Sequence, residues 1–128
     1  MTIKVYKAKK IKNPKGEIIK FLDNKSKYFL NFGEVYFNVI KRNKISDWIY
    51  HKKNQCIFLC IKGSVKFKVK EKSKEKVITI SKKNNKILII SPRNWFKFNS
   101  NSSDSIIVNL INIKHNDNEV KKNLVKQK

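Results

Sequence analysis

Few residues of this chain could carry out acid–base or metal chemistry, because it contains only two histidines and two cysteines. His51 stands between the aromatic segment 48–50 and a pair of lysines, shortly before an apolar run. An unperturbed imidazole has a pKa of about 6.5, so it can take up and return a proton near neutral pH. We therefore consider His51 as a general base in a pocket. The alternatives are a metal ligand and a surface histidine, and a lone histidine is more often structural than catalytic.

The two cysteines, Cys56 and Cys60, are close in sequence but cannot form a disulfide in a strand. In an extended strand their Cα atoms would lie about 13 Å apart, whereas a disulfide requires a separation below about 7 Å. We expect two buried free thiols. A zinc site needs more ligands than two cysteines and a distant histidine provide. His115 is expected to cap or pack in the tail, which leaves only one histidine in the region of a possible site. We therefore predict no catalytic metal.

The net charge of +22 raises the question of a nucleic-acid partner. Only Arg42 and Arg93 are arginines among the 31 basic residues, and the lysines are spread along the whole chain. Base readout favours clustered arginine forks. We expect nonspecific polyanion binding with a steep salt dependence, but no specific nucleic-acid partner.

Length and hydropathy predict one domain, residues 1–128, with residues 115–128 as a basic C-terminal tail. No apolar run approaches the ~20 residues that a membrane-spanning helix requires, so no membrane partner is expected. The first sixteen residues contain no apolar core typical of a signal peptide. The expected location is therefore the cytoplasm.

Apolar residues recur at every second position in several short segments. Val65, Phe67 and Val69 alternate with lysines, which is typical of a half-buried strand. Similar segments are found at 33–41, 55–62, 76–81, 86–91 and 105–113, separated by turn signals, and 55–62 is apolar enough to be covered on both faces. The pattern predicts an all-β barrel or sandwich. Asn116 and Glu119 have capping-box spacing, which allows a short C-terminal helix.

One polar residue interrupts the apolar segment 106–113. Asn109 alternates with Ile107 and Ile111, so its side chain should point inward, where it must find a partner or face a cavity. Tyr36 lies on an earlier predicted strand, and Trp95 follows the turn at residues 91–92. The alternatives are that both aromatic residues belong to the core and that Asn109 bonds the backbone at a bulge.

The order of the pieces along the chain resembles the sugar-nucleotide cupins. These pieces are IKNPKGEIIKFL, FGEVYFNVI, W-x-x-H-K-K, KGSVKFKV, SPRNWFKF and NLINIKHNDNEV, which together span roughly residues 11–121. The chain resembles short relatives of dTDP-4-dehydrorhamnose 3,5-epimerase, and it is also similar to the dTDP-sugar 3,4-ketoisomerases. The resemblance implies a cupin jelly roll (a double-stranded β-helix), usually a homodimer. It also implies proton removal next to a ketone, without a redox cofactor or a required metal.

The resemblance also implies roles for individual residues. His51 and Tyr36 would be the catalytic residues, in a pocket for a dTDP-sugar substrate or ligand. Asn109 would also line this pocket, with Trp95 near its mouth. Lys53, Arg93 or Arg42 would hold the diphosphate, and the choice among these three stays open.

The sequence also departs from both groups of relatives. Ile49 stands where they have a histidine, Asn109 where the epimerases have a tyrosine acid, and Cys56 where a lysine is expected near the enolate. Ser46 or Ile45 replaces an arginine of the ketoisomerases. Isoleucine and asparagine do not act as titrating acids, which disfavours inversion of two centres and favours a reaction with one base.

The leading interpretation is an isomerase of a dTDP-4-keto-6-deoxy sugar, like the 3,5-epimerases, in surface polysaccharide biosynthesis. The alternatives are a dTDP-sugar 3,4-ketoisomerase and a noncatalytic cupin that binds a nucleotide sugar.

Overall fold

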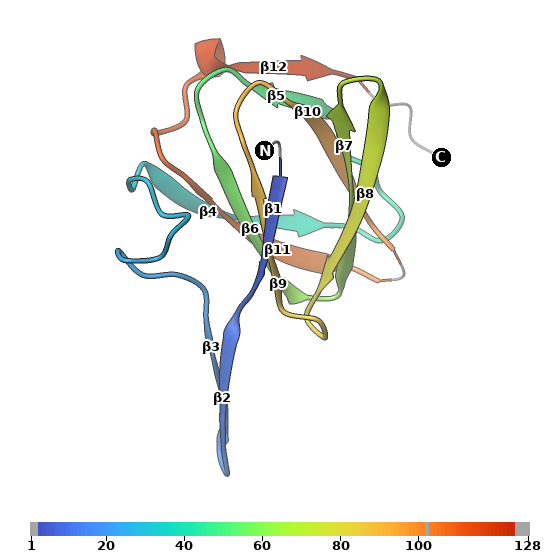
Figure 1. Ribbon diagram of the computed structural model, residues 1–128. Coiled ribbons are helices and arrows are strands. Elements are labelled where there is room, and N and C mark those ends of the chain that lie inside the picture. Colours follow the sequence, from blue (N-terminus) through green and yellow to red (C-terminus); the bar gives the residue numbers. More distant parts are fainter. Residues whose placement is uncertain (1–2, 102, 125–128) are drawn as a thin grey trace.

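The computed structural model describes residues 3–101 and 103–124, and these residues are folded almost entirely into strands (Figure 1). A single turn of 3-10 helix, η1 (Asp117–Glu119), is the sole helical element in this described part. The strands are β1 (Ile3–Lys7), β2 (Lys9–Asn13), β3 (Gly16–Lys20), β4 (Glu34–Ile40), β5 (Trp48–His51), β6 (Cys56–Lys62), β7 (Ser64–Glu71), β8 (Lys74–Ser81), β9 (Lys86–Ile90), β10 (Trp95–Ser100), β11 (Ser105–Ile111) and β12 (Val120–Asn123).

Two five-stranded sheets form the body of the molecule. One has the order β1-β9-β6-β11-β4 and the other the order β12-β5-β10-β7-β8, with antiparallel pairing throughout. The β2–β3 hairpin forms a separate small sheet that projects away from this body (Figure 1). The arrangement confirms the predicted all-β fold, a cupin jelly roll.

The core between the sheets follows the period-two pattern of the sequence. In β7, the side chains of Val65, Phe67 and Val69 are completely buried, while the alternating lysines face outward. In β6, residues from Cys56 to Cys60 are all buried, as the sequence predicts. One face of β6 packs into the core between the sheets, and the other packs under the segment that contains Phe21 and Phe29. Both cysteines are buried free thiols, as expected.

The predicted turn at Gly63 joins β6 to β7 where the chain passes close to β11. Gly63 has a φ of +79°, a left-handed conformation that favours glycine, and an added Cβ would collide with Oγ of Ser105. This glycine allows the sharp connection that holds β6 and β7 in opposite sheets.

The C-terminal segment differs from the predicted short helix. Asn116 does cap a helical turn, with its side-chain oxygen accepting a hydrogen bond from the backbone N–H of Asn118, but this turn is only η1. The chain then becomes extended, because residues from Val120 to Asn123 pair with the open edge of β5 and satisfy its backbone groups. In the described residues, the possible short C-terminal helix is limited to this single 3-10 turn. None of their helical segments is long and apolar enough to cross a membrane.

Candidate active site

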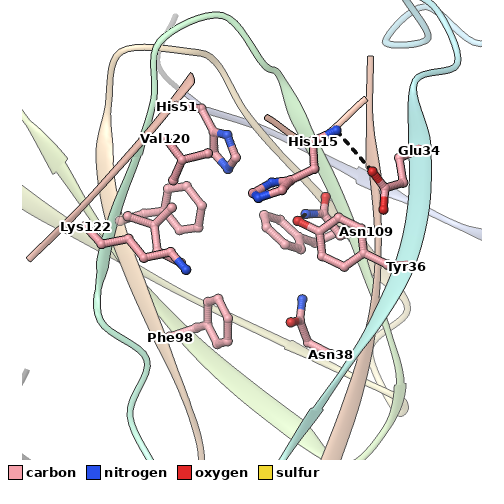
Figure 2. A pocket seen from close by; sticks show the side chains of 12 residues that line it. Glu34, Tyr36, Asn38, His51, Phe98, Asn109, His115, Val120 and Lys122 are labelled. Carbon is pink, nitrogen blue, oxygen red and sulfur yellow. Dashed lines mark hydrogen bonds between the residues drawn. The ribbon is translucent and has the colours of Figure 1, made fainter. Parts of the chain in front are cut away.

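A cavity of about 320 Å³ opens between the two sheets (Figure 2). Its walls come from β4, β5, β6, β10, β11 and the C-terminal segment, and are formed by Glu34, Tyr36, Asn38, Ile49, His51, Phe58, Phe96, Phe98, Asn109, His115, Val120 and Lys122. Alternating side chains of one strand point to the same face, so β4 turns Glu34, Tyr36 and Asn38 inward together. An apolar floor with a few converging polar groups is typical of a small-molecule site.

His51 lies at one wall of the cavity and is held by a buried carboxylate. Nδ1 of His51 and Oε1 of Glu119 are 2.8 Å apart, and the two residues are 6% and 7% exposed. Oε2 of Glu119 accepts hydrogen bonds from the backbone N–H groups of Lys53 and Asn54, and Nδ2 of Asn54 donates to Oε1. Together, these hydrogen bonds fix the position of the Glu119 carboxylate.

The same hydrogen bonds decide the charge of Glu119. Burial alone would raise the pKa of this carboxyl, but the hydrogen bonds from His51, Lys53 and Asn54 outweigh it and lower the pKa to about 2. An ionised carboxylate can only accept, so Nδ1 of His51 must carry the hydrogen. In neutral His51, Nε2 is then the unprotonated nitrogen, which is the state that a general base requires.

Tyr36 and Asn109 form the opposite wall. They are direct partners across the β4–β11 pairing, and Nδ2 of Asn109 donates a 2.9 Å hydrogen bond to the hydroxyl oxygen of Tyr36. Asn109 is 2% exposed, as its inward orientation in the sequence predicts, and its Oδ1 has no hydrogen-bond partner in the described residues.

The Tyr36 hydroxyl is better suited to donate a hydrogen bond than to accept a proton from carbon. Burial, together with the nearby Cys56, raises the pKa of Tyr36 to about 12. Because the phenol stays protonated and its oxygen already accepts from Asn109, its own hydrogen is available to a ligand oxygen.

Two of the residues at which the sequence was expected to depart from its relatives, Ile49 and Cys56, have different places in the structure. Ile49 lines the cavity and contributes an apolar wall on the same strand as His51. Cys56 is 1% exposed and lies outside the lining, and burial raises its pKa to about 12, so the thiol is neutral. Neither residue supplies the charge that a histidine or a lysine would bring.

The structure places the other predicted binding residues outside the cavity lining. Trp95 points to the outer face of β10 and packs against Tyr50, with ring centroids 5.1 Å apart. The backbone N–H of Arg93 donates to the carbonyl of His51, while that of Arg42 donates to Asp104 in an exposed loop. Lys53 contributes its backbone N–H to Glu119, and its side chain is exposed.

Three residues of the C-terminal segment were not predicted as site residues. Glu119 holds His51, whereas His115 and Lys122 line the cavity directly. Figure 2 shows the side chains of His115 and Lys122 extending into the cavity beside His51 and Tyr36. The available signal for Glu119 was an acidic side chain in a basic tail. Among the described residues, no group of three or more histidine, cysteine, aspartate or glutamate side chains is placed to hold a metal ion.

Fold and site together define a class: a jelly-roll protein with a histidine–carboxylate pair and a tyrosine facing one cavity. The chain belongs to the family described as FdtA: WxcM-like, C-terminal, whose model matches residues 1–126. This confirms the resemblance to the sugar-nucleotide cupins. No curated protein sequence matches the chain significantly.

Solved structures share the fold over nearly the whole chain. A dTDP sugar isomerase from Desulfovibrio desulfuricans G20 has a TM-score of 0.89 at 21% identity, covering 95% of this chain and 83% of that one. QdtA, a sugar 3,4-ketoisomerase from Thermoanaerobacterium thermosaccharolyticum in complex with TDP, has a TM-score of 0.85 at 20% identity, with coverages of 95% and 88%. ChmJ, a 3'-monoepimerase from Streptomyces bikiniensis in complex with dTDP-quinovose, has 0.85 at 12%, with coverages of 94% and 69%. At these identities the likeness establishes the cupin fold.

Proposed function

We propose that this protein is an isomerase of a dTDP-4-keto-6-deoxy sugar and that its reaction is 3,4-ketoisomerisation. The observation that carries the proposal is the buried His51–Glu119 pair, in which Nδ1 of His51 is held by the carboxylate and Nε2 is left for a ligand in the cavity. Movement of a ketone to the neighbouring carbon needs a base that removes a proton from one carbon and returns it to the next. One imidazole on one face of the sugar can perform both transfers.

The remaining cavity residues fit the charge that develops in such a reaction. Removal of the carbon-bound proton places negative charge on the ketone oxygen. The protonated hydroxyl of Tyr36 and the ammonium group of Lys122 are the donors that would stabilise this enolate. The Tyr36 hydroxyl is held by its hydrogen bond from Asn109, and the backbone of Lys122 is fixed by the pairing of β12 with β5.

A second hollow supports a place for the nucleotide. It has a volume of about 480 Å³ and shares Asn38, Ile49, Phe98 and Lys122 with the cavity. Lys41 and Lys44 lie on its rim, and ammonium groups of this kind suit a diphosphate. We assign the sugar to the cavity and the nucleotide to this hollow. Among the predicted diphosphate ligands, Arg42 is adjacent to Lys41 in sequence but does not itself line this hollow.

A 3,5-epimerase or a monoepimerase is the second candidate, favoured by the Tyr36 hydroxyl. An epimerase must return a proton to the face opposite the base, and Tyr36 lies on the wall opposite His51. Its raised pKa and the replacement of the expected late-strand tyrosine by Asn109 make this route the weaker one.

The test is incubation with dTDP-4-keto-6-deoxyglucose in deuterated water, followed by mass spectrometry and NMR of the sugar. A ketone at C3 is the expected result. Deuterium with inversion at C3, or at both C3 and C5, would indicate an epimerase instead. Binding of the nucleotide sugar without any deuterium uptake above the protein-free control would indicate a noncatalytic cupin.

We also propose that the protein is a homodimer that associates through β4. This strand is an edge of its sheet, and its outward side chains Phe37 and Val39 are 61% and 70% exposed. Phe32, in the preceding segment, is 61% exposed. In so basic a chain, apolar side chains at an open edge are better explained by a second copy of the chain than by contact with water. A monomeric mass at micromolar concentration in light scattering would contradict this assembly.

A further inference from the structure

The second histidine of the chain lies in the same cavity as the first. His115 belongs to the segment between β11 and η1, and Figure 2 shows its ring directed into the cavity toward His51. The backbone N–H of His115 donates a 3.0 Å hydrogen bond to Oε1 of Glu34. The segment is therefore attached to β4 through its backbone, and the imidazole does not contribute to that attachment.

The environment of the His115 ring differs from that of His51. Its side chain is 44% exposed, and Nε2 lies 3.1 Å from Oδ1 of Asp117, a carboxylate that is 99% exposed. Nδ1 has no hydrogen-bond partner in the described residues. The other titratable groups that line this space are Glu34 and Tyr36 on β4, His51 on β5 and Lys122 on β12. His115 can therefore exchange protons with solvent and still reach a bound sugar.

A 3,4-ketoisomerisation moves a proton between two oxygens as well as a proton between two carbons. His51 would transfer the proton between the two carbons. Tyr36 cannot readily release a proton and take it back, because its pKa is about 12. Ile49 has no titrating group. The carrier of the oxygen-bound proton must then be one of Glu34, His115 and Lys122, and an imidazole is the group that can both donate and accept a proton near neutral pH.

We propose, resting on the proposed function, that His115 is this carrier and is a second catalytic residue that moves a proton between the two oxygens of the sugar. In the first step, His51 takes the proton from C3 and a double bond forms between C3 and C4, which leaves an enolate at O4; the protonated His115 ring then donates a proton to O4. In the second step, His115 takes the proton from O3, the ketone forms at C3, and His51 returns its proton to C4. Both imidazoles end in their starting states, and no other reactant is needed.

The first experiment compares proton removal with ketone transfer in the unmutated protein and the variant His115→Asn, using dTDP-4-keto-6-deoxyglucose in deuterated water. In the variant, Tyr36 and Lys122 still stabilise the enolate. We expect ketone transfer to C3 to fall roughly 10²-fold while deuterium entry at C3 of the recovered substrate stays within about threefold. The matched control is Lys114→Gln, an exposed neighbour outside the lining, which should leave both rates unchanged.

The outcomes separate this inference from the proposed function. Unchanged ketone transfer in His115→Asn overturns the role of His115 alone. An equal fall in both rates, with weaker binding of dTDP, assigns His115 to binding and also overturns it. If the unmutated protein neither exchanges nor transfers, the proposed function fails, and the role of His115 fails with it.

A second measurement does not depend on turnover. Because the chain has two histidines, each ring signal in ¹⁵N-labelled protein is assigned by its loss in His51→Asn or His115→Asn. Addition of dTDP-quinovose, which has no ketone to react, should shift both signals. A shift of His51 alone shows that the sugar does not contact His115. A shift of neither ring contradicts the sugar pocket itself.

Discussion

Strands β4 and β7 alternate with the same period, yet they turn opposite kinds of side chain toward the interior. In β7 the inward residues Val65, Phe67 and Val69 are apolar and completely buried, and the outward residues are lysines. In β4 three of the inward residues, Glu34, Tyr36 and Asn38, are polar and line the cavity, while Ile40 at the end of the strand is buried in the core. The outward residues Val35, Phe37 and Val39 are 47%, 61% and 70% exposed. The two strands therefore place polar and apolar side chains on opposite faces.

This difference divides the barrel into a packed half and a hollow half. Apolar side chains that face each other close the space between the sheets, whereas polar side chains that would lose their hydration leave it open. We expect changes in the packed half to reduce stability and changes in the hollow half to reduce activity.

The largest expected effect is in the hollow half, at His51. The variant His51→Asn keeps a polar side chain but lacks the base, so the rate of deuterium entry at C3 should fall about 10²–10⁴-fold. The buried Glu119 carboxylate loses its hydrogen bond from His51 in this variant, so the midpoint of thermal unfolding should also fall. Circular dichroism should still show the same strand signal. Retention of half or more of the activity would show that His51 is not the base.

The second effect tests the packed half, at Phe67. Phe67 is 0% exposed and packs against Phe58 and Phe98 with ring centroids 4.9 and 5.3 Å apart. Phe67→Ala should lower the free energy of unfolding by about 3–5 kcal/mol, measured by urea denaturation. Tyr36→Phe, which removes one oxygen in the hollow half and leaves Nδ2 of Asn109 without its acceptor, is the comparison and should cost less, about 1–2 kcal/mol. Equal losses would contradict the division into two halves.

The third effect is a pH dependence caused by Glu119. Because its pKa falls from an ordinary 4.5 to about 2 in the folded state, its ionised form stabilises the fold above pH 4.5. That contribution is lost as the pH falls from 4.5 toward 2. Glu119→Gln should therefore differ most from the unmutated protein in urea unfolding at pH 6, and the difference should narrow toward pH 3.

The control for this pH dependence is Glu75→Gln, an exposed carboxyl on β8. It should leave the pH dependence unchanged. A difference between Glu119→Gln and the unmutated protein that stays constant over the same pH range would mean that Glu119 is not ionised and held as described.

The smallest effect on stability is expected on the outward face of β4. Phe37→Ser exchanges an exposed apolar side chain, so the free energy of unfolding of the protomer should change by no more than about 0.5 kcal/mol. The mass in light scattering should nevertheless fall to that of one chain, because the side chain belongs to the proposed dimer surface. An unchanged dimer would place the interface elsewhere.

Residues close in sequence allowed much of this fold to be predicted. Apolar residues alternate in β7 because one of its faces is buried, and they are continuous in β6 because both of its faces are buried. Each pattern can be recognised within five to seven consecutive residues. The inward orientation of Asn109 follows from the same rule. Trp95 shows its limit, because alternation in β10 buries Phe96 and Phe98 and turns Trp95 outward, where it packs against Tyr50.

The part of the site that could not be predicted is formed by residues distant in sequence. Glu119 reaches His51 only because β12 pairs with β5, and a local capping-box pattern instead predicted a helix. His115 enters the cavity because its backbone bonds Glu34, 81 positions away. Neither contact leaves a periodic signal in the sequence, since each depends on how the barrel closes.

The His51–Glu119 pair also links activity to the order of folding. Its partners are 68 positions apart, so a large loop must close before the carboxylate can fix the imidazole. A chain whose other strands have already paired would hold His51 with neither its hydrogen-bond partner nor its fixed tautomer. Turnover should therefore recover in refolding only after β12 has docked on β5, and its recovery would report that docking.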